Sequence, residues 1–191
     1  MIELVIVIAV ILILTGGALL NYTNATKKMR EEAGLQVALG QLRNARDLSI
    51  GQRRKYRVTF TTPRTIQLDQ VVYDSSGTRS FQFVSSTTLP NDLQFTAISG
   101  IPTGSANTPD NLPTTGVPID FSIDYGGGGT EVFFYPDGRA VDSNGRPNNG
   151  VVYVARPGEL MSSRAVSVLS ATARIKPWRL IKNGTGVKWT E

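Results

Sequence analysis

Residues 1–14 read MIELVIVIAVILIL, and this stretch decides how the rest of the chain must be organised. After Glu3 it contains no polar side chain, and flanking apolar residues extend the segment to about twenty positions, enough for a helix to cover the roughly 30 Å of a bilayer core. No lysine or arginine occurs before Lys27. The sequence therefore predicts a long apolar helical segment over residues 1–20.

Three explanations of this segment compete. A secretory signal peptide needs a basic leading region, and none is present. A membrane anchor fits the length but places the Glu3 carboxylate at the edge of the apolar core, where a charge is costly. If helices from many copies pack side by side, Glu3 can pair with the free α-amino group of a neighbour and set the axial register. We favour this third interpretation, because it alone explains the carboxylate.

Under this interpretation Glu3 provides subunit pairing and register. The core of the assembly would be formed by the apolar side chains that follow it: Leu4, Val5, Ile6, Val7, Ile8, Val10, Ile11, Leu12, Ile13 and Leu14. Gly16 and Gly17 would let the helix adapt, since an interior glycine costs about 1 kcal/mol relative to alanine. Close packing of helices explains the glycine pair equally well.

The composition excludes most catalytic chemistry. None of the 191 residues is a cysteine or a histidine, which removes disulfides, thiolate nucleophiles, histidine-based catalytic pairs and the usual transition-metal ligands. Asp120 and Asp124 are too far apart on a predicted strand for a glycosidase pair, at about 13 Å, and we expect both to be solvated. Asp142, Asn144 and Gly145 predict a turn in preference to a calcium loop. We expect no enzyme activity, cofactor or metal.

The chain after the apolar segment predicts two kinds of structure. Residues 21–54 continue the helix as an amphipathic one, with apolar residues at spacings of three and four on a single face: Leu35, Ala38, Leu39, Leu42 and Ala45. From residue 55 the apolar period becomes two, and short runs, including one over residues 119–125, alternate with Gly/Pro/Asn turns. Residues 55–191 thus predict an antiparallel β-sandwich packed on the second half of the helix, an α+β fold.

The opening segment resembles the amino-terminal helix of type IV pilins and type II secretion pseudopilins. Two later segments, EVFFYPDGRA at residues 131–140 and RAVSVLSATARIKPWR at residues 164–179, resemble the GspH/FimT-like branch of that superfamily. The resemblance implies a pilin-like fold and a structural subunit of a pilus or pseudopilus filament. It implies a single pass in the bacterial inner membrane before assembly, followed by a periplasmic or extracellular filament. The implied partners are other copies or related pilin subunits, an assembly platform and a prepilin peptidase.

The C-terminal segment is basic and suggests an alternative function. Residues 161–191 carry six Lys/Arg and one Asp/Glu, and cations alternate there with aromatic residues, a pattern that suits phosphates and bases. The candidate DNA-binding residues of a minor tip pilin are Arg174, Lys176, Trp178, Arg179 and Lys182. By resemblance to some FimT-like pilins, Arg174 and Lys176 would contact DNA. The competing explanation, which we favour, is an edge hairpin whose tryptophans pack on the sandwich and whose lysines discourage sheet pairing.

Overall fold

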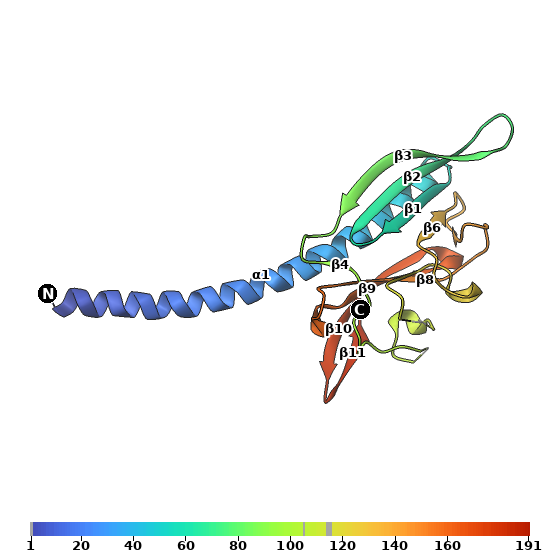
Figure 1. Ribbon diagram of the computed structural model, residues 1–191. Coiled ribbons are helices and arrows are strands. Elements are labelled where there is room, and N and C mark those ends of the chain that lie inside the picture. The colour runs from blue at the N-terminus through green and yellow to red at the C-terminus, as the bar shows by residue number, and fades with distance from the viewer. Residues whose placement is uncertain (1, 105, 114–115) are drawn as a thin grey trace.

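The computed structural model describes residues 2–104, 106–113 and 116–191, and within the first helix the side chains at positions 14, 16–21 and 24 are outside this description. Helix α1 (Ile2–Gly51) contains 50 residues, so it is about 75 Å long at 1.5 Å per residue. Figure 1 shows its first half projecting as a free rod with the N-terminus at the far end, while its second half enters a domain of strands. The predicted continuous helix is confirmed.

The second half of α1 is held by the apolar face that the sequence predicted. Leu35, Ala38, Leu42 and Ala45 are fully buried, and they pack in one core with side chains from both sheets. Gly34 permits the closest approach, because a Cβ at this position would lie 2.4 Å from Cδ1 of Leu93. Tertiary packing therefore stabilises this half of the helix, as expected for an amphipathic segment.

The first sheet packs on α1 through β1 (Tyr56–Thr61), whose alternate side chains Tyr56, Val58 and Phe60 are buried. Every neighbouring pair in this sheet is antiparallel. Its spatial order is β3 (Arg79–Thr88), β2 (Thr65–Tyr73), β1, β6 (Glu131–Phe134) and β7 (Ala140–Val141). The long strands β2 and β3 lie side by side in Figure 1, in front of the second half of α1.

The second sheet is centred on β8 (Gly150–Ala155), which is buried along its whole length. Val152 and Val154 face the main core, and Val151 and Tyr153 face a second apolar cluster with Ile101, Ala165, Leu180 and Trp189. Its spatial order is β11 (Gly186–Thr190), β10 (Arg174–Asn183), β9 (Arg164–Leu169), β8 and β4 (Gln94–Phe95), with β5 (Ile119–Asp120) also paired to β8. The predicted antiparallel β-domain packed on the helix is thus confirmed.

In the described part of the chain, single turns of 3₁₀ helix connect these strands: η1 (Pro109–Asn111), η2 (Ile123–Tyr125), η3 (Leu160–Ser162) and η4 (Ser170–Thr172). The turn η2 corrects the predicted strand over residues 119–125, because the chain leaves the sheet after Asp120. The prediction that Asp120 is solvated is also wrong, since this side chain is 1% exposed. Its Oδ1 accepts hydrogen bonds from the backbone N–H groups of Ser122 and Gly128, so the carboxylate holds the turn together.

The turn predicted at residues 142–145 is confirmed. The Oδ1 atom of Asp142 accepts the N–H groups of Asn144 and Arg146, and its Oδ2 accepts the Arg146 guanidinium at 2.7 Å, which is the geometry of a closed turn. Within the described ranges, no group of three or more Asp, Glu, His or Cys residues is placed to hold a metal ion.

Candidate assembly helix and its junction with the domain

The projecting part of α1 exposes apolar side chains around its whole circumference. Every large apolar residue from Ile2 to Ile13 is between 49% and 75% exposed, and Glu3 at its start is exposed as well. The environments of Leu14, Gly16 and Gly17 lie outside what the structure describes. A continuous apolar surface of this length is unfavourable in water, because monomeric soluble proteins rarely expose large apolar patches. We therefore expect these apolar side chains to be buried against another apolar surface.

No helix in the part of the chain described with its side chains is long and apolar enough to cross a membrane. The predicted single membrane pass over residues 1–20 includes side chains at positions 14 and 16–20 that lie outside this description, and it stays a prediction.

Glu31 is the first described side chain along α1 that is buried, so it marks the point where the rod enters the domain. It is 6% exposed. Its Oε1 accepts Nη1 of Arg156 at 3.1 Å, and its Oε2 accepts Nη2 of Arg164 at 2.8 Å. A buried carboxylate is tolerable when two guanidinium groups compensate its lost hydration. The two arginines come from opposite ends of the connection between β8 and β9, so this carboxylate fixes the helix to the second sheet.

Arg156 is the centre of this arrangement. Besides Glu31, it donates to Oδ2 of Asp92 at 2.9 Å and forms a short hydrogen bond with Glu159. Burial disfavours its charge, but the hydrogen bonds to Asp92 and Glu159 outweigh that effect and raise the pKa of the Arg156 guanidinium. Burial conversely lowers the pKa of Arg164, and the charge of Glu31 opposes this shift. Both remain cations at neutral pH, so the pairs are ionic.

Glu32 makes the second tie between the helix and the sheet. Arg179 in β10 donates from Nε to Oε2 at 3.0 Å and from Nη2 to Oε1 at 2.6 Å, which is a bidentate pairing. These hydrogen bonds hold the pKa of the Glu32 carboxyl below its usual value. We call the set that joins rod and domain the junction cluster; its members are Glu31, Glu32, Asp92, Arg156, Arg164 and Arg179.

The candidate DNA-binding residues are mostly engaged within the chain. Arg174 pairs with Asp110 at 2.8 Å, Lys176 pairs with Glu191 at 2.6 Å, and Arg179 belongs to the junction cluster. Trp178 donates from Nε1 to Oγ of Ser167 at 2.9 Å. Among these five predicted residues, Lys182 alone has no hydrogen bond or ion pair from its side chain to the described part of the chain. The structure therefore does not assemble the five into one open cationic surface.

The tryptophans pack on the sandwich, as the favoured interpretation of the tail predicted. Trp189 is 7% exposed, and its ring centroid lies 5.6 Å from that of Tyr153 in the second cluster. Trp178 packs against the same cluster. Lys188 is exposed on β11, the edge strand of the second sheet. A cation on an edge strand discourages pairing with another sheet.

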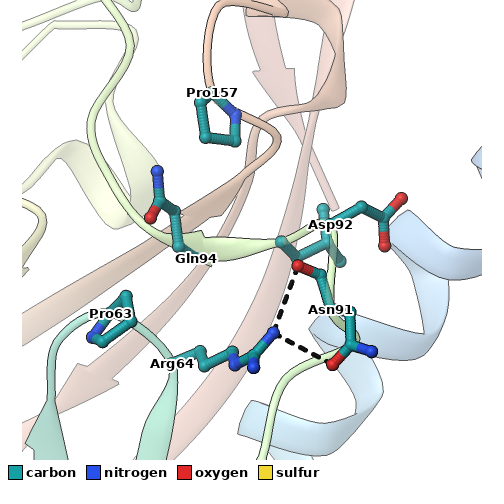
Figure 2. Close-up of a pocket in the computed structure, with 7 residues that line it drawn as sticks. Pro63, Arg64, Asn91, Asp92, Gln94 and Pro157 are labelled. Carbon is teal, nitrogen blue, oxygen red and sulfur yellow. Dashed lines mark hydrogen bonds between the residues drawn. The ribbon is translucent and has the colours of Figure 1, made fainter.

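A small cavity of about 220 Å³ lies beside the junction, and Figure 2 shows its lining. Nη1 of Arg64, from the turn between β1 and β2, donates to the backbone oxygen and to Oδ1 of Asn91 across it. The Asp92 carboxylate points away from this cavity toward α1, where it meets Arg156. Pro63 and Pro157 complete the walls seen in the figure. Asp92, the one carboxylate residue of the lining, is thus engaged in the junction cluster. The lining also presents no nucleophile with an adjacent base.

The sequence analysis missed the junction cluster. Glu31 and Arg156 are separated by 125 positions, and Glu32 and Arg179 by 147. No local spacing pairs residues so distant. The only available signal was the adjacent Glu31–Glu32 pair on the helix, opposite in sign to the basic C-terminal segment.

A long N-terminal helix whose apolar side chains from Ile2 to Ile13 are exposed, packed by its second half on antiparallel sheets, defines a pilin-like fold. Among solved structures, the type IV minor pilin FimU of Pseudomonas aeruginosa matches this chain with a TM-score of 0.51 and 13% sequence identity, over 85% of this chain and 95% of FimU. The minor pseudopilin EpsH from the type 2 secretion system of Vibrio cholerae matches with a TM-score of 0.49 and 13% identity, over 78% of this chain and 97% of EpsH. No family model and no curated protein matches the sequence. At this identity the likeness to FimU establishes the fold, and it agrees with the pilin resemblance of the sequence.

Proposed function

We propose that this protein is a structural subunit of a pilus or pseudopilus filament that polymerises through the first half of α1. The observation that carries the proposal is the rod itself, whose apolar side chains from Ile2 to Ile13 are exposed on all sides. Its fold is shared with FimU, which is a minor pilin. The proposed role is mechanical, and the chain itself catalyses no reaction.

The energetics favour assembly. Ten large apolar side chains of the rod are about half exposed or more. Covering each would contribute about 1–2 kcal/mol, and together about 10–20 kcal/mol. Association of two proteins costs about 4–15 kcal/mol in lost translational, rotational and side-chain freedom. The free energy gained by burying these side chains among similar rods therefore exceeds the cost of association when several neighbours cover the rod.

We further propose that Glu3 sets the axial register. A carboxylate buried in an apolar bundle needs a cation, and the free α-amino group of a neighbouring subunit is one that every copy would carry. Residues 1–20 would then form the filament core, with Gly16 and Gly17 adapting the helix. The assembly platform and the prepilin peptidase remain partners implied by the pilin resemblance.

The junction cluster supports the same role. It clamps the helix at the point where the rod leaves the domain, with ionic contacts to two separate segments of the second sheet. A rod anchored in this way presents the domain at a defined orientation when the rods pack. The junction would thereby carry load between the filament core and the surface domains.

The experiment is incorporation of Glu3→Ala into filaments in the native host, scored by immunoblotting of sheared and sedimented filaments. We expect at least a tenfold loss of incorporation, because an unpaired α-amino group would remain in the core. The matched control is Asp137→Ala, which removes an exposed carboxylate from the domain. Incorporation of Glu3→Ala at the wild-type level would refute the role of Glu3 in register. If neither the wild type nor the control variant sediments with filaments, the assembly proposal is refuted.

The alternative of a DNA-binding tip pilin has less support. Three of its four candidate cations form ion pairs with carboxylates of the same chain. Binding a phosphate backbone would require these pairs to break or to be shared, which weakens the electrostatic gain.

A further inference from the structure

A second cavity lies between α1 and the turn that leads into β10, on residues that the assembly proposal does not use. Its volume is about 490 Å³. Its lining consists of Arg43, Arg46 and Asp47 from α1, Thr172 from η4, and Arg174 and Ile175 from β10. Three arginines therefore line one cavity whose lining includes a single carboxylate residue.

The charges in this cavity are not balanced from within. Within the described ranges, Asp47 forms no ion pair with Arg43 or Arg46, although it is four positions from the first and adjacent to the second. Arg174 is paired through Nη2 with Asp110 at 2.8 Å, outside the lining, so its remaining donors could reach a ligand only if it shares this pair. Like charges gathered in a recess repel one another unless an anion lies between them.

Arg46 provides an independent observation. Its Nε is buried, yet it has no hydrogen-bond partner in the described part of the chain. A buried donor of a charged group without a partner is unfavourable, and such groups in native proteins are usually satisfied by a bound ion or water. This atom belongs to a side chain that lines the cavity.

The backbone is also unusual here. Ala173 adopts a left-handed conformation, with φ 43° and ψ 39°, which residues other than glycine seldom do. Its two neighbours, Thr172 and Arg174, both line the cavity. Strained backbone of this kind is maintained where the surrounding structure requires it, and it is frequent at binding sites.

From these observations we propose that the cavity, which we call the arginine pocket, binds a small phosphate-bearing ligand from solution. Several guanidinium groups that converge from a helix and a strand can share the three or four oxygens of a phosphate, each as a fork of donors. The hydroxyl of Thr172 is a further donor in the lining. No aromatic side chain lines the pocket, so a nucleobase would have no surface on which to stack.

The probe is inorganic phosphate added to the full chain in a non-ionic detergent, against chloride at equal ionic strength. We expect saturable heat in calorimetry with a millimolar or tighter Kd. Arg46→Lys retains the charge but loses the fork, and Arg43→Gln removes an exposed cation of the lining. We expect each to weaken phosphate binding at least fivefold. Arg54→Gln, at an exposed arginine outside the pocket, should bind as wild type.

Three results would overturn the proposal. The first is a phosphate response no larger than that of chloride. The second is equal phosphate binding by wild type, Arg46→Lys and Arg43→Gln, which would place the anion elsewhere. The third is binding of duplex DNA without binding of inorganic phosphate, which would indicate a nucleic-acid surface and not a pocket for a small ligand. Because none of these measurements involves filaments, failure here is distinguishable from failure of the assembly proposal.

Discussion

Arg179 donates two hydrogen bonds, of 3.0 and 2.6 Å, to the carboxylate of Glu32, which lies 147 positions earlier in the chain. The pair joins β10 to the helix at the base of the rod. The basic C-terminal segment therefore has a structural task, because one of its arginines holds the assembly helix in place. A mutation there would change the attachment of the rod before it changed any external binding surface.

The Glu32–Arg179 pair predicts a dependence of stability on pH. The hydrogen bonds from Arg179 place the pKa of Glu32 in the folded protein below its value in the unfolded chain, about 4.3. The contribution of the pair is therefore complete above that pH and is lost as the pH falls through the folded pKa. Because both side chains are more than a third exposed, we expect this contribution to be only about 0.5–1 kcal/mol.

Urea unfolding of wild type and Glu32→Gln at pH 6 and pH 3 measures this effect. The variant should be less stable at pH 6, and its difference from wild type should shrink toward pH 3, because the pH then falls toward the lowered folded-state pKa of Glu32 and the wild-type carboxylate gains protons. An equal stability difference at both values would show that the ionised carboxylate is not what stabilises the junction.

Glu31 should matter more for stability than any exposed carboxylate. Glu31→Ala removes a carboxylate that is 6% exposed and leaves Arg164, which is itself largely buried, without its ion pair. Removing one partner of a buried ion pair costs about 3–5 kcal/mol. The measurement is the free energy of unfolding in denaturant.

The control for Glu31 is Asp137→Ala, which breaks an exposed pair with Arg139. Exposed pairs contribute less than about 1 kcal/mol. A similar small loss for both variants would mean that the junction is not a buried ionic centre.

Two helical glycines should respond in opposite directions to the same substitution. Gly34→Ala places a Cβ 2.4 Å from Cδ1 of Leu93, and we expect overpacking to cost about 1–3 kcal/mol. Gly40→Ala meets no atom within 4 Å, and we expect a gain of about 0.5–1 kcal/mol from helix propensity. Thermal unfolding of both variants beside wild type tests the packing of the second half of α1. Stabilisation by Gly34→Ala would contradict the observed contact with Leu93.

A charge in the rod should impair assembly without affecting the domain. Ile8 is 49% exposed and belongs to the part of α1 that projects from the domain. Ile8→Lys should therefore leave the melting temperature of the domain within about 2 °C of wild type, because exposed substitutions change stability by less than about 0.5 kcal/mol. We expect incorporation into filaments to fall at least tenfold. Normal incorporation of the lysine variant would show that this segment does not lie in an apolar filament core.

The basic tail should show little affinity for DNA. The ion pairs of Arg174 and Lys176 already neutralise these two cations. We therefore expect the full chain to lack salt-dependent binding to duplex DNA between about 50 and 200 mM salt, the range over which the affinity of a protein that contacts several phosphates falls steeply. Fluorescence anisotropy with labelled duplex is the measurement. Strong binding that weakens steeply with salt and is lost in Arg174→Gln/Lys176→Gln would reverse this conclusion.

The strands show where local pattern was sufficient and where it failed. Tyr56, Val58 and Phe60 alternate in the sequence and are buried as predicted, because every second side chain of a strand faces the same side. The same alternation at residues 119–125 predicted a strand that ends at Asp120 in the structure. The hydrogen bonds of the Asp120 carboxylate to Ser122 and Gly128 divert the chain there, and apolar periodicity carries no information about such a side-chain contact.

The sequence by itself determined the rod. Helix formation depends on contacts between residues three or four positions apart, and an apolar run longer than its own domain can cover must be buried by something else. Only the tertiary structure decided which charges would meet. The junction cluster and the arginine pocket bring together residues that lie more than a hundred positions apart. Such pairings depend on how the two sheets close over the helix, and neither composition nor spacing along the chain specifies that closure.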